Sequence, residues 1–168
     1  MKRVLFTLIT SGLWLVGCTT YRPLTADQLM TAREAMEFVC EHTTDADMLE
    51  ACQVLPPPEI KVDLTGAQRK DDGKLVGILG QFNPLADPGS IHLDVLMTQM
   101  PIWFQNAVII HEVTHYLDWN DANQIEPTRA GACNTETKAH LEEHIYLVMT
   151  GHWEEFARDA SWYEWYGC

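Results

Sequence analysis

The segment His111-Glu112-Val113-Thr114-His115 constrains this chain more than any other feature, because its spacing predicts both a helix and a site. In an α-helix, residues four positions apart lie on the same face, so the imidazoles of His111 and His115 would converge on one point. Two neutral imidazoles at this spacing can hold Zn²⁺, and Glu112 would reach a water bound to the same ion. The pattern therefore predicts a helix over this segment and one zinc ion beside it.

Hydrophobic periodicity predicts further helices before and after the motif. From Ala26 to about Cys40, apolar residues recur every three or four positions, and Asp45 to Val54 adds a helical turn or two. Pro101 suits the first turn of the helix that carries the motif. The polar connection from Asn120 to Pro127 then leads into a second strong helix from about Ala132 to Met149.

Between the first and the later helices the pattern changes to that of strands. Ile60 to Leu64 alternates apolar and polar residues, and Leu75 to Phe82 reads as a second strand. Residues 68–73 form a polar turn that ends in Asp-Gly, so these two strands are expected to make a hairpin. Ser90 to Met97 alternates again and predicts a third strand. The chain is therefore expected to be an α+β protein with a small, mostly antiparallel sheet.

A catalytic zinc site needs a third protein ligand in addition to the two histidines, and one position left for water. Glu136 lies 21 residues after His115, on the second predicted helix. Glu143 is the alternative ligand, since it lies seven residues further along and therefore on the same helical face. Glu142 points elsewhere.

The motif and Glu136, within Asn134-Thr135-Glu136-Thr137-Lys138-Ala139-His140, resemble the gluzincin metallopeptidases, the thermolysin-like class, over roughly residues 90 to 150. The resemblance implies a zincin-like domain, in which an N-terminal helix and a small sheet accompany the active-site helix and a glutamate-bearing helix. It also implies that Glu136 is the third ligand and that an extended peptide pairs with the strand at Ser90 to Met97. His140 stands where the family often has an acidic residue supporting a zinc histidine, and is expected to make that supporting hydrogen bond. The glycine and third histidine of the metzincin pattern are absent after His115, which excludes that branch.

The expected function is hydrolysis of a peptide or protein substrate, with Glu112 acting as general base on a zinc-bound water. His140, His144, His152 and the tyrosines of the C-terminal tail are candidates for stabilising the oxyanion. The alternative is a non-catalytic envelope lipoprotein that keeps zinc for stability and acts as a binding or assembly module.

The first 17 residues predict a signal peptide, with Lys2 and Arg3 before an apolar run from Val4 to Val16. Leu15-Val16-Gly17-Cys18 resembles the bacterial lipobox, which implies that Cys18 is acylated and becomes the first residue of the mature chain. An ordinary secretory signal with an incidental cysteine is the alternative. If Cys18 is acylated, residues 18–25 are a lipid-anchored tether, and residues 26–168 are expected to form a single domain. Thr19 implies sorting to the outer membrane, facing the periplasm.

Charge and the remaining cysteines agree with an exported protein. Without Lys2 and Arg3 the chain has nine basic and 24 acidic residues, a formal charge of −15 that excludes nucleic acid and direct adhesion to anionic lipid. The membrane partner is therefore reached through the lipid, and an envelope protein is a further possible partner. Four cysteines remain in an oxidising compartment and allow three pairings, of which we favour Cys40 with Cys52 and Cys133 with Cys168. None has the CxxC spacing typical of zinc sites.

Overall fold

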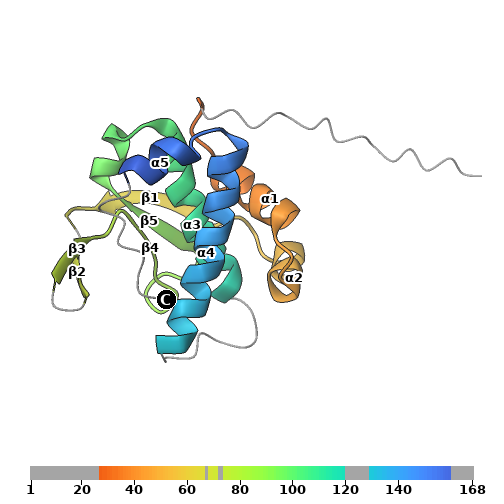
Figure 1. Ribbon diagram of the computed structural model, residues 1–168. Coiled ribbons are helices and arrows are strands. Elements are labelled where there is room, and N and C mark those ends of the chain that lie inside the picture. Colours follow the sequence, from red (N-terminus) through yellow and green to blue (C-terminus); the bar gives the residue numbers. More distant parts are fainter. Residues whose placement is uncertain (1–26, 67, 72–73, 120–128, 160–168) are drawn as a thin grey trace, which may run out of the picture.

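A computed structural model describes residues 27–66, 68–71, 74–119 and 129–159 (Figure 1). The predicted signal peptide, Cys18 and the tether lie outside the described residues. The elements are, in order, α1 (Ala32–His42), α2 (Ala46–Val54), β1 (Glu59–Leu64), β2 (Gln68–Asp71), β3 (Lys74–Gly77), β4 (Gly80–Phe82), β5 (Ser90–Asp94), a 3-10 helix η1 (Val95–Gln99), α3 (Ile102–Trp119), α4 (Arg129–Met149) and α5 (Trp153–Asp159). The expected α+β class is confirmed. None of the described helices combines the length and apolar character needed to cross a membrane.

The main sheet has three strands in the order β1-β5-β4 and is mixed, not mostly antiparallel as expected. β1 runs parallel to β5, with Ile60 opposite Ile91, whereas β4 runs antiparallel to β5, with Gln81 opposite His92. β2 and β3 form a separate antiparallel hairpin. The expected hairpin between residues 60–64 and 75–82 is therefore wrong.

The wrong hairpin prediction has a physical origin in residues 68–71. Their charged and polar side chains suggested a turn, but charged residues are common in short strands at a sheet edge. This stretch pairs with Lys74–Gly77, so the predicted second strand divides into β3 and β4.

β5 is shorter than expected because Asp94 ends it. The Asp94 side chain accepts hydrogen bonds from the backbone N–H groups of Leu96, at 2.8 Å, and Gly66, also at 2.8 Å. The first of these turns the chain into η1. Because β5 has a partner on both sides, it cannot be the edge strand that pairs with a peptide. That expectation is wrong, and among the described residues the edge strand that packs beside α3 is β4.

α3 is the central helix, with the sheet on one side and α4 and α1 packed against its other sides (Figure 1). Its residues are buried almost all round, as expected for a helix enclosed by other elements. The buried Asn106 side chain joins three parts of the chain. Its Oδ1 accepts from the Met30 backbone N–H at 2.8 Å, and its Nδ2 donates to the Tyr146 hydroxyl at 3.0 Å.

The two N-terminal helices are defined by their caps and a disulfide. Thr31 and Glu34 form a capping box at the start of α1, which explains why this helix begins later than Ala26. The Asp45 carboxylate caps α2 by accepting from the N–H groups of Asp47 and Met48. Cys40 in α1 and Cys52 in α2 form a disulfide, so the first favoured pairing is confirmed. The pairing of Cys133 with Cys168 lies outside the residues whose side chains are described.

The C-terminal end of α4 is set by Gly151, whose φ of 79° lies in the left-handed region. The N–H of His152 donates to the carbonyl of Leu147 at 2.8 Å, and the N–H of Gly151 to that of Val148 at 3.2 Å. This is the Schellman arrangement, which satisfies the last carbonyls of a helix. α5 follows directly and packs on α4 through Trp153 and His144.

Glu142 on α4 provides a pH-dependent prediction, because the residue is only 3% exposed and its Oε2 has no hydrogen-bond partner among the described residues. Burial raises the pKa of Glu142, and a hydrogen bond with Thr43 offsets this only in part. A carboxyl with a raised pKa in the folded state loses stability as the pH rises above its unfolded value. Glu142→Gln is therefore expected to increase the free energy of unfolding at pH 7 by about 1 kcal/mol. In urea denaturation the gain should shrink towards pH 4, and an equal gain at both pH values would contradict the assignment.

Candidate metal centre

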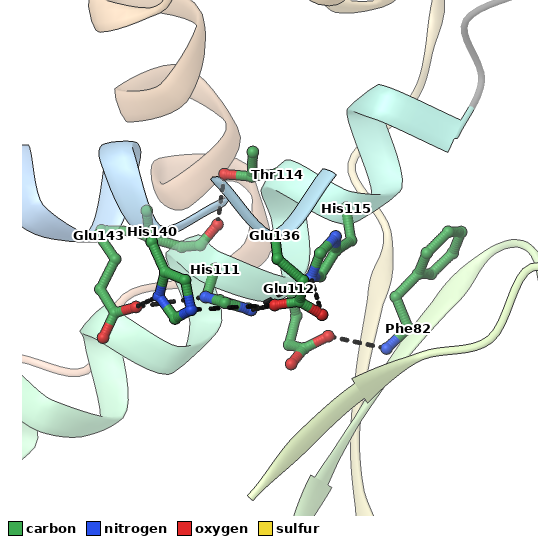
Figure 2. A network of polar contacts seen from close by, with 9 residues as sticks. Phe82, His111, Glu112, Thr114, His115, Glu136, His140 and Glu143 are labelled. Atoms are coloured by element: carbon green, nitrogen blue, oxygen red, sulfur yellow. Dashed lines mark hydrogen bonds and ion pairs between the residues drawn. The ribbon is translucent and has the colours of Figure 1, made fainter. Parts of the chain in front are cut away.

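Two adjacent helices bring the predicted ligands together (Figure 2). α3 carries His111 and His115, and their Nε2 atoms lie 3.1 Å apart. From α4, Glu136 Oε2 lies 3.4 Å from the His111 Nε2, and Glu136 Oε1 lies 3.7 Å from the His115 Nε2. One atom from each of the three residues lies within 4.8 Å of the other two, so the group could hold a metal ion.

These separations can be compared with those that a tetrahedral zinc site would need. Zn²⁺ binds imidazole nitrogen and carboxylate oxygen at about 2.0–2.2 Å, so neighbouring ligand atoms in a tetrahedron lie about 3.3–3.5 Å apart. The two Nε2 atoms lie 3.1 Å apart, and each histidine is nearest a different oxygen of Glu136, Oε2 at 3.4 Å from His111 and Oε1 at 3.7 Å from His115. Two imidazoles and one carboxylate also leave one corner of the tetrahedron for a water or a substrate oxygen.

Glu143 contacts Nδ1 of His111, on the side of the ring opposite the Nε2 atom that faces the predicted metal position. Its Oε2 lies 3.2 Å from His111 Nδ1 and 3.1 Å from His140 Nδ1. A proton on the His111 Nδ1 would be donated to this carboxylate, which leaves the Nε2 lone pair directed at the metal position. Glu143 therefore makes the supporting bond that was expected of His140, and His140 in turn contacts Glu143.

A second group of residues could also hold a metal ion, formed by His111, His140 and Glu143. It would use the other ring nitrogen of His111 and would not include His115. The first group contains both histidines of the motif, and Glu143 then provides the supporting carboxylate. Both groups could hold an ion, and it is the motif, which includes His115, that favours Glu136 over Glu143 as the third ligand. His140 Nε2 also lies 3.9 Å from Glu136 Oε2, so His140 lies between the two glutamates.

The electrostatics of this cluster favour positive charge. Burial disfavours the imidazolium of His111, but hydrogen bonds with Glu136 and Glu143 outweigh it and raise the pKa of His111 to about 10. Burial also acts to raise the pKa of Glu136, but hydrogen bonds with His111 and His115 lower it far below its ordinary value. The pKa of Glu143 is lowered in the same way by His111 and His140. A divalent cation would satisfy the same carboxylates.

Glu112 lies on the side of α3 that faces β4 (Figure 2). Its side chain is largely buried, and its Oε2 accepts a hydrogen bond of 2.8 Å from the backbone N–H of Phe82. The Phe82 ring packs edge-on against Tyr116, one helical turn further along α3, at a centroid distance of 5.6 Å. Glu112 is therefore held beside the three ligands by an edge strand of the sheet.

No protein-family model, curated protein or solved structure matches this chain.

The other histidines proposed for the oxyanion contact aromatic rings. His144 packs edge-on against Trp153, with ring centroids 4.0 Å apart, and His152 stacks on Trp103 at 5.0 Å. His140 contacts the two glutamates described above. The tyrosines of the tail lie outside the described residues. Among the described candidates, His140 is therefore the one placed beside the predicted ligands.

An ion-pair cluster fixes α4 against α3 close to Glu136. Lys138 Nζ lies 2.5 Å from the buried Asp118 carboxylate on α3 and 2.9 Å from the Asp45 carboxylate at the start of α2. Asp118 follows His115 by three residues, and Lys138 follows Glu136 by two. The cluster therefore joins α3 and α4 close to the place where the predicted ligands meet.

Lys138→Met is expected to lower the free energy of unfolding by about 2–3 kcal/mol, because it leaves the Asp118 charge buried without its partner. Lys61→Met is the matched control, since Lys61 pairs with Asp87 at 2.6 Å on the surface, where both side chains are one-third exposed. Urea denaturation should show a much smaller change for the control. Equal losses in the two variants would contradict a structural role for the buried cluster.

Three features of the site were not predicted from the sequence. The Phe82 contact is made by a backbone N–H, and no side-chain pattern signals it. The support of His111 by Glu143 depends on how α3 and α4 cross. The ion-pair cluster joins residues from three helices, and only the acidic residue soon after the motif could have suggested it.

Proposed function

We propose that this protein is a zinc-dependent peptidase of the bacterial cell envelope, of the gluzincin type. The observation that carries the proposal is the convergence of His111 Nε2, His115 Nε2 and the Glu136 carboxylate, with the carboxylate of Glu112 held beside them. Three protein ligands with one open corner are typical of catalytic zinc, whereas structural zinc sites normally have four protein ligands.

Zinc bound by these residues would polarise the scissile carbonyl and increase the acidity of a water molecule. Glu112 would accept a proton from the attacking water and deliver it to the nitrogen of the leaving amine. Glu143 would keep the Nε2 of His111 available as a ligand, through its contact with Nδ1. The side chains from α3 and α4 would thus bind the ion, and Glu112 would move the proton.

We also propose that the protein is a lipoprotein anchored through Cys18, facing the periplasm. The support comes from the lipobox-like sequence and from the Cys40–Cys52 disulfide, since disulfides form mainly in oxidising compartments. Cys18→Ala is expected to abolish incorporation of labelled fatty acid and to release the protein from the membrane fraction. Retention of label in this variant would contradict the assignment of the acylated residue.

The function is tested by zinc stoichiometry and by peptide cleavage on the same sample. One zinc per chain is expected, together with cleavage of members of a peptide library. A chelator should remove the activity and added zinc should restore it. A stoichiometric zinc protein that cleaves no peptide would instead favour the alternative function, a zinc-stabilised binding or assembly module.

A further inference from the structure

Gly80 lies at the closest approach between β4 and α3. A Cβ atom built at this position would lie 2.8 Å from both Cγ and Oε1 of Glu112, and 2.9 Å from Cγ1 of Val108. Such contacts are shorter than real Cβ atoms make, so a larger residue would displace either the glutamate side chain or the strand. The φ of Gly80 is not positive, so its backbone conformation does not require glycine. Glycine is required here by the close approach of the strand to Glu112.

The N–H of Phe82 is available to Glu112 because of the register of β4. In the antiparallel pairing, Gln81 lies opposite His92, and the Asp94 N–H donates to the Leu79 carbonyl at 2.8 Å. Alternate residues of an edge strand direct their backbone groups towards the neighbouring strand and away from it. The backbone N–H and C=O groups of Leu79 and Gln81 therefore point towards β5, whereas those of Gly80 and Phe82 point away from it. The sheet does not need the Phe82 N–H, which donates to Glu112 Oε2 at 2.8 Å.

We propose that Gly80 and the Phe82 amide are positioning residues for Glu112. Gly80 sets how closely the glutamate side chain lies against the strand, and the Phe82 N–H fixes the orientation of the carboxylate. The proposal rests on the proposed function, in which Glu112 must meet a water at one defined place. A misplacement of about 1 Å in such a group can cost about a hundredfold in rate.

Gly80→Ala tests the first half of the proposal on the zinc-loaded protein. We expect kcat to fall by about 10- to 100-fold, with KM changed less than about twofold and zinc content unchanged. Gly89→Ala is the matched control, because no atom of the described residues lies within 4 Å of a Cβ built at Gly89. The control should retain the kcat of the wild type. A wild-type kcat in Gly80→Ala, or a loss of kcat that only accompanies loss of zinc, would overturn the role of Gly80.

A pair of substitutions at Phe82 isolates the hydrogen bond. Phe82→Ala removes the ring and keeps the N–H, whereas Phe82→Pro removes both. Proline is compatible with an edge strand where the missing N–H faces away from the sheet. The proline variant is expected to have a kcat at least about tenfold below that of the alanine variant, at similar KM and zinc content. Equal kcat values in the two variants would overturn the role of the amide.

Hydrogen exchange of the Phe82 amide provides a readout that does not depend on activity. Glu112→Gln retains an acceptor oxygen and should keep the amide protected, whereas Glu112→Ala should accelerate its exchange by at least about tenfold. Equal exchange rates of the Phe82 amide in the two variants would overturn the contact between this amide and Glu112, whatever the peptidase activity of the variants. If this exchange pattern held while the wild type cleaved no peptide, the proposed function would be wrong and the contact would stand. If turnover depended on Glu112 but the Phe82 variants were equal, the positioning role alone would fail.

Discussion

Glu112→Gln is expected to lower kcat for peptide hydrolysis by about a thousandfold, because general acid–base catalysis contributes about 10²–10⁴-fold. Glutamine has nearly the same shape as glutamate, and its side-chain oxygen can still accept the Phe82 N–H. The three predicted zinc ligands are unchanged, so zinc content should remain at one ion per chain. The measurement is kcat and zinc stoichiometry on the same preparation.

Glu142→Gln is the matched control, since it replaces another buried glutamate and lies outside the predicted site. We expect it to have wild-type turnover. The comparison also separates the two candidate functions. A peptidase loses turnover in Glu112→Gln alone, whereas a zinc-stabilised binding module would bind its partner equally well with either variant. Full turnover in Glu112→Gln would therefore exclude the proposed mechanism.

Much of the candidate site could be predicted from the sequence because it depends on local geometry. The spacing of His111 and His115 places both rings on one face of any α-helix, whatever surrounds it. Glu136 required one further assumption, that the helix after the motif turns back alongside it, and the packing of α4 on α3 agrees with this. The contacts of Glu143 and Phe82 depend on distances between separate elements, which residue spacing does not contain.

The sheet was predicted less well than the helices for the same reason. The limits of β1 were close to those expected, but its partner was wrong, because strand pairing is decided by packing across the chain. The parallel pairing of β1 and β5 joins strands that are separated by the β2–β3 hairpin and β4. Alternation of apolar residues identifies a strand but does not identify its neighbours. The resemblance implied that β5 was the edge strand, whereas among the described residues the edge strand beside Glu112 is β4.

Glu136→Gln is expected to weaken zinc binding by about a thousandfold, because it removes one of only three protein ligands. The same substitution at Glu143 should weaken binding by about 10- to 100-fold, the usual effect of removing a group that supports a metal ligand. The two variants are matched in chemistry and lie on the same helix. Competition with a chromophoric chelator measures both affinities, and circular dichroism checks that both variants are folded.

The order of these two losses decides which glutamate binds the ion. If zinc occupied the group formed by His111, His140 and Glu143, Glu143→Gln would have the larger effect and His115→Ala would have little. If it occupies the group formed by His111, His115 and Glu136, His115→Ala should match Glu136→Gln. Only the group formed by His111, His115 and Glu136 uses both histidines of the motif and places the ion on the side of α3 where Glu112 lies (Figure 2). A larger loss in Glu143→Gln would therefore separate the ion from its proposed general base, and hydrolysis by Glu112 would no longer follow from the fold.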